Sequence, residues 1–173
     1  MKRHIYFFLL LFAVVFSGCK KEKIEYRNEF EKSFKAWTDF KLASNNSYSY
    51  TTSTVSWTGY TTETAIHVLN GQVVGRSYVA KGREEDQVTL VVLEQWEENG
   101  KTLNTHSNGA PLLNLDQIYE LAKNDLLLKR PDANISFETK NSGLISAAGY
   151  VKEGCQDDCF VGVKIKSISK YVP

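Results

Sequence analysis

The stretch that decides the fold is residues 60–80, which read YTTETAIHVLNGQVVGRSYVA. Asn70 and Gly71 at its centre are the pair preferred in a two-residue type I′ hairpin, because both residues tolerate a positive φ. The β-branched and aromatic residues on both sides favour strands. The stretch therefore predicts an antiparallel hairpin of residues 60–69 and 72–80, with the opposed pairs Leu69–Gln72, Val68–Val73 and His67–Val74.

The chain before this hairpin changes composition near residue 43. Aromatic residues recur every three or four positions in residues 22–42, which predicts an amphipathic helix whose aromatic stripe packs on a sheet. Residues 43–62 carry no charge, and their Ser, Thr and Tyr content predicts a further strand. Because side chains alternate along a strand, one face of it carries Tyr48, Tyr50, Thr52 and Thr54, and the other carries Val55 and Trp57.

The chain after the hairpin contains another helix and several strands. Residues 88–93 are apolar on both faces, which suits a central strand covered on both sides or a strand near an edge of the core. Asn99-Gly100 predicts a turn into a short returning strand, residues 102–106. Asn114 and Gln117 have the spacing of a capping box ahead of a helix that ends at Pro131. The last third predicts three strands, residues 134–140, 144–152 and 160–171, with a bulge or strand end near Ser167.

The order of these elements is a helix, about four strands, a second helix and three strands. Strands and helices do not alternate, so the sheet should be largely antiparallel. We therefore expect an α+β fold with a meandering antiparallel sheet. The N-terminal helix and the second helix should pack on one face of it. Residues 26–173 fit a single domain of this kind.

The N-terminus reads as an export signal. Lys2 and Arg3 precede an apolar run, residues 5–16, which has the length of a signal h-region and is too short to span a bilayer. Residues 16–19 read FSGC and resemble a bacterial lipobox, although Phe16 stands where Leu is usual. We expect residues 1–18 to be removed, Cys19 to carry acyl chains such as palmitate, and residues 19–25 to form a lipidated tether. Lys20, directly after the expected lipidated cysteine, favours the outer membrane over the inner membrane. The sequence does not decide between the periplasmic face and the surface face of that membrane.

Charge and cysteine content limit the partners. The chain has 21 basic and 20 acidic residues, and loss of Lys2 and Arg3 with the signal leaves a net charge of −1. A near-neutral exported protein argues against a nucleic-acid partner, which would require a concentrated basic face. With Cys19 lipidated, Cys155 and Cys159 remain as an even pair in an oxidising compartment, which favours one disulfide across a turn.

Other chemistry for the cysteine turn has less support. A redox pair is usually spaced Cys-x-x-Cys, and zinc would need two further ligands, for which only His67 and His106 are available. Asp157 and Asp158 with Glu153 could hold calcium, but the regular spacing of oxygen ligands is missing. We expect no metal and no cofactor, and whether Asp157 and Asp158 bind an ion stays open.

Candidate functional residues point to binding more than to catalysis. No Gly-x-Ser-x-Gly motif occurs, His67 lies in mid-strand, and paired carboxylates occur only in charged loops, so no catalytic residue is assigned. Tyrosine and tryptophan give large contact areas at low entropic cost. The candidate binding face is therefore Tyr48, Tyr50, Trp57 and Tyr60, provided that the first helix does not cover it.

Several short motifs also resemble a known family when taken in their order along the chain. They are Trp37, Asn46-x-Tyr48-x-Tyr50, Asn70-Gly71-Gln72-Val73-Val74, Leu115-Asp116-Gln117-Ile118-Tyr119, Gly143-Leu144-Ile145 and Asp158-Cys159-Phe160-x-Gly162. This set resembles a family of uncharacterised bacterial envelope lipoproteins that contain a domain of unknown function. The resemblance implies a small secreted or lipidated α+β domain and implies no known activity.

Together these features predict a lipid-anchored cell-envelope protein, a non-enzymatic binding or interaction module. Its partners would be the membrane, through Cys19, and an envelope protein or glycan. The alternatives are a small-molecule or glycan-binding lipoprotein and, with less support, a periplasmic hydrolase. The oligomeric state stays open.

Overall fold

The structure is a computed structural model that describes residues 23–83, 89–157 and 159–171. The expected signal peptide, the Cys19 lipidation site and the start of the tether lie outside the described residues. The elements, in chain order, are α2 (Arg27–Ala43), β1 (Tyr48–Val55), β2 (Thr61–Leu69), β3 (Gln72–Arg83), β4 (Leu90–Asn99), the 3₁₀ turn η2 (Gly100–Thr102), α3 (Leu115–Leu121), the π-helical turn η3 (Ala122–Leu126), β5 (Ala133–Glu138), β6 (Ala147–Lys152) and β7 (Val161–Lys170).

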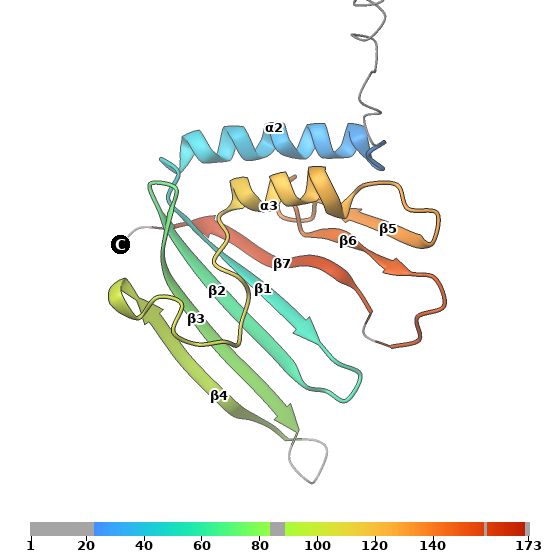
Figure 1. The fold of residues 1–173 in the computed structure, drawn as a ribbon. Helices are drawn as coiled ribbons and strands as arrows, with labels where there is room; N and C mark the ends of the chain where they lie inside the picture. The colour runs from blue at the N-terminus through green and yellow to red at the C-terminus, as the bar shows by residue number, and fades with distance from the viewer. Residues whose placement is uncertain (1–22, 84–88, 158, 172–173) are drawn as a thin grey trace, which may run out of the picture.

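The seven strands form one sheet in the order β4-β3-β2-β1-β7-β6-β5, and every neighbouring pair is antiparallel. The predicted α+β fold with an antiparallel sheet is confirmed. The first and last strands, β1 and β7, pair in the middle of the sheet. Figure 1 shows α2 and α3 above one end of the sheet, while the β1–β2 turn extends away from them.

The hairpin between β2 and β3 forms at Asn70-Gly71, where both residues have a positive φ (50° and 81°). The predicted pairs Leu69–Gln72 and Val68–Val73 are confirmed, but the predicted pair His67–Val74 is wrong. An extra residue bulges from β3 at this point, so His67 lies opposite Gly75. A Cβ on Gly75 would lie 3.4 Å from His67 Cδ2, at ordinary van der Waals contact with the imidazole.

The apolar segment of β4 is at the edge of the sheet, so the alternative of a central strand is wrong. Leu90, Val92 and Leu93 are more than half exposed. The predicted returning strand, residues 102–106, is also wrong. These residues form the end of η2 and a loop. The Asn104 and His106 amides of the loop donate to the Glu98 carboxylate, in place of the backbone hydrogen bonds that a paired strand would make.

Helix α3 begins with the predicted capping box. The Gln117 amide donates to Asn114 Oδ1 (2.9 Å), and the Asn114 amide donates to Gln117 Oε1 (2.8 Å). The Asn114 side chain also donates to the Gly71 carbonyl oxygen (3.0 Å), which ties the start of the helix to the β2–β3 hairpin. The box therefore fixes both the start of α3 and its place beside the sheet.

The core lies where α2, α3 and the sheet meet. The Trp37 ring of α2 lies edge-on to Tyr48 of β1 (5.2 Å between centroids) and stacked on Tyr119 of α3 (6.1 Å). Strand β7 carries the predicted irregularity near Ser167, because its register with β1 shifts between Ser167 and Ile165. Within the described residues, the structure contains no helix long and apolar enough to cross a membrane.

Candidate binding groove

The four residues of the predicted binding face separate into two groups. Tyr48 and Tyr50 are buried, at 0% and 2% exposure, so they do not form one exposed face with Trp57 and Tyr60. The reason is that α2 covers this end of β1, with Trp37 and Phe40 against the Tyr48 ring. The predicted alternation holds for Tyr48 and Tyr50, which share the face that α2 covers, whereas Trp57 lies in the turn after β1 ends at Val55.

The two buried tyrosines hold the segment that leads into α3. The Tyr48 hydroxyl accepts a hydrogen bond from the Leu115 amide (2.8 Å), and the Tyr50 hydroxyl donates to the Leu113 carbonyl oxygen (2.5 Å). Burial raises the pKa of both hydroxyls, so they stay neutral hydrogen-bonding groups. Their role is structural.

The other two residues are accessible. Trp57 is 81% exposed at the β1–β2 turn. Tyr60 is 40% exposed, and its hydroxyl lies 3.4 Å from the Tyr78 hydroxyl. Burial, the hydrogen bond with Tyr60 and nearby charge raise the pKa of Tyr78 to about 12. Tyr78 is therefore an uncharged polar group, and both tyrosines line a groove.

The groove opens where two central strands separate. The ladder between β1 and β7 ends at the pair Thr52–Ile165. Beyond it, residues 53–55 pair only with β2 and residues 161–164 pair only with β6. Figure 1 shows β1 and β7 diverging away from the helices. The resulting groove has a volume of about 610 Å³, within the range of about 300–1,000 Å³ typical of ligand sites.

The walls of the groove are mostly uncharged and polar. One wall is residues 52–56 with Tyr60, and the opposite wall is Phe160 with residues 162–164. Threonines 62 and 64 of β2 and Tyr78 of β3 lie between the first wall and a loop, residues 108–111, that borders the groove. Among the described lining residues, Lys164 is the one with a charged side chain, and its Nζ lies 4.7 Å from the centre of the Phe160 ring.

A buried ion pair that was not predicted from the sequence holds the bordering loop. Arg76 and Glu98 face each other across β3 and β4, almost completely buried, with Arg76 Nε 3.0 Å from Glu98 Oε2. Arg76 also donates to the carbonyl oxygens of Ala110 (3.0 Å) and His106 (2.8 Å). The Ala110 amide in turn donates to Thr64 Oγ1 (3.0 Å), so the loop is fixed over the sheet.

The Glu98 carboxylate stays ionised. Burial raises its pKa, but the His106 and Asn104 amides and the His106 and Arg76 side chains donate to it and lower the pKa to about 2. The sequence analysis considered only paired carboxylates in charged loops and did not identify Glu98, a buried carboxylate whose partner is an arginine. The signal in the sequence was Arg76 in the middle of β3, which lies on the strand next to that of Glu98 and required a partner once buried.

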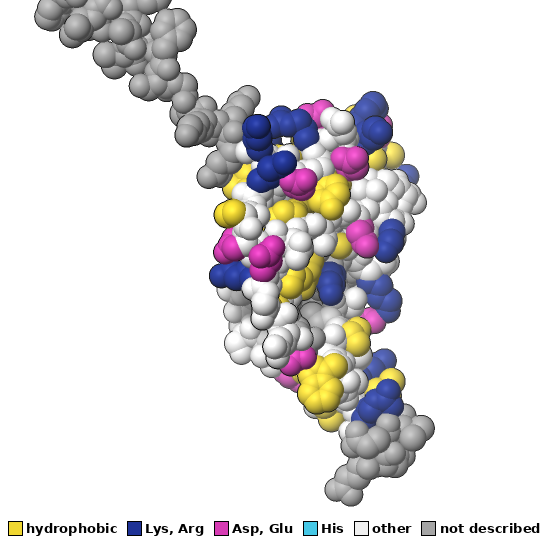
Figure 2. Space-filling model, turned by 90° about the vertical axis from the view of Figure 1, so that its right-hand side faces the viewer, with side chains coloured by type: hydrophobic (Ala, Val, Ile, Leu, Met, Phe, Trp, Pro, Cys, Tyr) yellow, Lys and Arg dark blue, Asp and Glu magenta, His cyan; other side chains and the backbone are white. Residues whose placement is uncertain are grey.

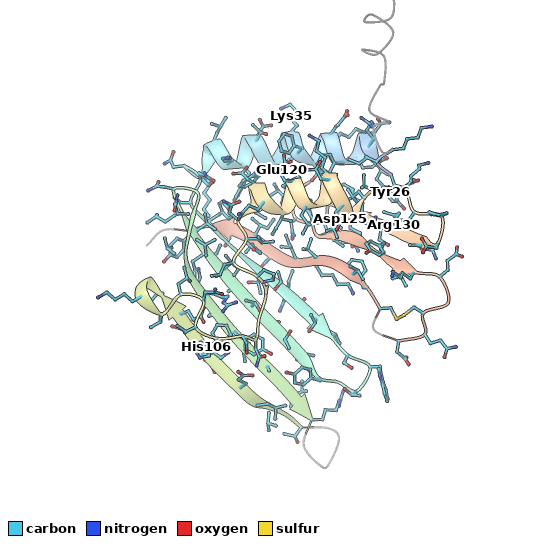
Figure 3. All side chains as sticks on the ribbon, viewed as in Figure 1. Tyr26, Lys35, His106, Glu120, Asp125 and Arg130 are labelled. Atoms are coloured by element: carbon cyan, nitrogen blue, oxygen red, sulfur yellow. A yellow bond between two sulfur atoms is a disulfide. The ribbon has the colours of Figure 1, made fainter. Side chains whose placement is uncertain are left out.

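His106 completes this cluster through its backbone and its ring. Its ring stacks on Trp96 (4.3 Å between centroids), and its Nδ1 lies 3.0 Å from Glu98 Oε1. Figure 3 shows His106 beside β4, at the opposite end of the molecule from Asp125 and Arg130, which form an ion pair of their own. The arrangement therefore stabilises the loop beside the groove.

His67 has a different partner. Ser49 lies opposite it in the β1–β2 ladder, and Ser49 Oγ lies 2.6 Å from His67 Nδ1. The His67 ring also contacts the Tyr171 ring (5.1 Å). Within the described part of the chain, no carboxylate bonds to His67, so the pair lacks the third member that a hydrolase triad uses to orient histidine.

Cys155 and Cys159, the pair predicted to form a disulfide, lie at disulfide distance, with their Cα atoms 6.2 Å apart. The pair closes the connection between β6 and β7. Asp157 is exposed, and Asp158 lies outside the described residues. Among residues 23–83, 89–157 and 159–171, no cluster of three His, Cys, Asp or Glu side chains could hold a metal ion.

Comparisons of the chain with family models, with curated proteins and with solved structures gave no significant match. Its function is therefore inferred from the groove and from the N-terminal sequence.

Proposed function

We propose that this protein is a lipid-anchored component of the bacterial cell envelope that binds a ligand in the groove between β1 and β7. The apolar run of residues 5–16 and the following Ser17-Gly18-Cys19 support export and acylation at Cys19. Lys20 supports the outer membrane over the inner membrane. The tether then holds the folded domain, including α2 and the sheet, at the membrane surface.

The observation that carries the binding function is the uncovered part of the sheet. In this proposal both helices pack on one face of the sheet, which the contacts of Trp37 with Tyr48 and Tyr119 support. They leave the far ends of β1 and β7 open as a groove of about 610 Å³. A folded domain that is fixed on one side and hollowed on the other is suited to receive a ligand.

The chemistry of the groove favours binding without catalysis. Its hydroxyl groups come from serines, from threonines and from Tyr60 and Tyr78, of which Tyr78 has a pKa of about 12. Such groups orient a ligand by hydrogen bonds but do not exchange protons near neutral pH. Figure 2 shows basic and acidic side chains interspersed on one side of the molecule, which supports partners other than nucleic acid.

Site-specific photo-crosslinking in living cells tests this function. A benzophenone amino acid at Tyr60 reports on the groove, and the same amino acid at Gln95 is the matched control. Gln95 is exposed on the edge strand beside Trp96, and neighbouring strand residues point to opposite faces. We expect a discrete adduct at Tyr60 and none at Gln95. Equal labelling at both positions, or no adduct at Tyr60, would contradict a ligand in the groove.

The anchor is tested separately. Radioactive palmitate should label the wild-type protein, and Cys19→Ser should abolish both the labelling and the recovery in the membrane fraction. Labelling that persists in Cys19→Ser would refute the lipobox interpretation.

A further inference from the structure

We infer that the ligand of the groove is an extended polypeptide segment, which adds as a strand between β1 and β7 and carries an acidic side chain close to Lys164. This inference rests on the proposed function, because it names the class of ligand for the same groove. It is carried by three features: two open strand edges, the close attachment of the start of β7 to β6, and the position of one cation that forms no ion pair among the described residues.

The first feature is a pair of strand edges, one on β1 and one on β7, that face each other but are not paired with each other by backbone hydrogen bonds among the described residues. Residues 53–55 of β1 pair with Glu63, Thr62 and Thr61 on their other side. Residues 161–164 of β7 pair with β6 on theirs. Among the described residues, no backbone hydrogen bond joins residues 53–55 to 161–164. Open edges of this kind are templates for another strand, which satisfies their N–H and C=O groups.

The second feature attaches the start of β7 closely to β6. Gly149 of β6 and Gly162 of β7 are paired, and their backbones approach so closely that a Cβ on Gly162 would lie 2.2 Å from the Ala148 carbonyl oxygen. Gly162 has a φ of +153°, which a residue with a side chain rarely adopts. The Cys155–Cys159 disulfide lies in the connection just before this pair. The start of β7 is therefore bound to β6, and the groove is built into the sheet.

The third feature is the charge of Lys164. Its side chain lies at the wall of the groove, and among the ion pairs of the described residues none involves Lys164. Lys166, two residues along the same strand, is by contrast paired with Glu63. An acidic side chain on the bound peptide would form an ion pair with Lys164, as Glu63 does with Lys166.

A glycan is the competing ligand, and it would use different groups. A sugar binds through hydroxyl side chains and through the face of an aromatic ring. The threonines and Tyr60 could serve this purpose, but the two open backbone edges would then remain unused. Because a peptide strand satisfies the edges and the side chains together, the groove favours a peptide.

The experiment selects peptides with the purified lipoprotein in detergent. A phage-displayed library of random linear heptapeptides is the first probe, because seven extended residues span about 23 Å and cover the edge of residues 161–164 with overhang. Chitotetraose and maltotetraose are the second probe. Amide hydrogen exchange then locates any bound probe on the chain.

We expect selected heptapeptides to be acidic and to slow exchange at least tenfold at amides within residues 53–55 and 161–164. N-methylation of alternate residues keeps the side chains of a peptide and removes donors along one edge, so it should weaken binding at least tenfold. Lys164→Glu should weaken binding about fivefold, whereas Lys152→Glu, an exposed lysine outside the groove, should leave it unchanged.

The other outcomes are distinguishable. Oligosaccharides that protect the groove while no peptide is selected would overturn the strand inference and leave the proposed function standing. Peptides that bind without protecting both edges, or that tolerate N-methylation, would also overturn it. If neither probe binds and the Tyr60 crosslinker gives no adduct in cells, the proposed function fails as well.

Discussion

The removal of the Trp37 side chain should cost a large share of the stability of this fold. The Trp37 ring is 1% exposed and touches Phe40 of its own helix, Tyr48 of β1 and Tyr119 of α3. Its Nε1 also donates to Asp116 Oδ1 (2.9 Å). Truncation of a buried aromatic residue to Ala costs about 3–5 kcal/mol. Asp116 keeps its bond to Lys41 Nζ (2.6 Å), so little is added for the lost hydrogen bond.

We therefore expect Trp37→Ala to lower the free energy of unfolding by about 4 kcal/mol, a large share of the roughly 5–15 kcal/mol of a domain. Urea denaturation followed by far-UV circular dichroism measures this value. The matched control is Trp57→Ala, because Trp57 is 81% exposed. It should change the free energy by less than about 0.5 kcal/mol.

The comparison can refute the reasoning directly. Equal losses in the two variants would mean that α2 does not hold α3 and the sheet through Trp37. Trp37→Phe separates the ring from the hydrogen bond, because it keeps an aromatic ring and removes the Nε1 donor. It should lose clearly less than Trp37→Ala.

Two further predictions concern the elements beside the groove. The pKa of Glu98 is lowered to about 2, so its contribution to stability is complete above its ordinary value of about 4.3 and is lost as the pH falls towards 2. The melting temperature of wild type should therefore fall more steeply than that of Glu98→Gln between pH 5 and pH 2; parallel curves would contradict this. Replacement of Cys155 and Cys159 by Ser should lower the unfolding free energy by about 2 kcal/mol, since the closed loop is short, and a loss below about 0.5 kcal/mol would show that the disulfide constrains little.

Local signals in the sequence predicted local structure well. The capping box of Asn114 and Gln117 and the Asn70-Gly71 turn depend only on residues within the motif, and both form as expected. The register of the hairpin departs from expectation at His67, because an extra residue bulges from β3 and places Gly75 between His67 of β2 and the adjacent strand β4. A Cβ on Gly75 would lie 3.4 Å from the Glu98 carbonyl oxygen of β4.

Long-range relations were not predictable in the same way. The apolar pattern of β4 is compatible with a central or an edge strand, and only the order of the sheet decides between them. The alternation of β1 identified a tyrosine face, but coverage by α2 determines that Tyr48 and Tyr50 are buried. The groove depends on where the β1–β7 ladder ends, which involves segments more than 100 residues apart.

The central β1–β7 pairing also sets the order in which the chain can fold. Strands β1 to β4 are a meander of neighbours and can assemble as soon as they are made. The edge of β1 that pairs with β7 then stays unpaired until β7, the last of the described strands, has been synthesised. Loop-closure entropy makes so distant a contact slow to form, and an open edge during that interval invites pairing with another copy. The final strand is thus the step that completes the sheet, and a chain that ends before residue 161 would present β1 as a free edge along its whole length.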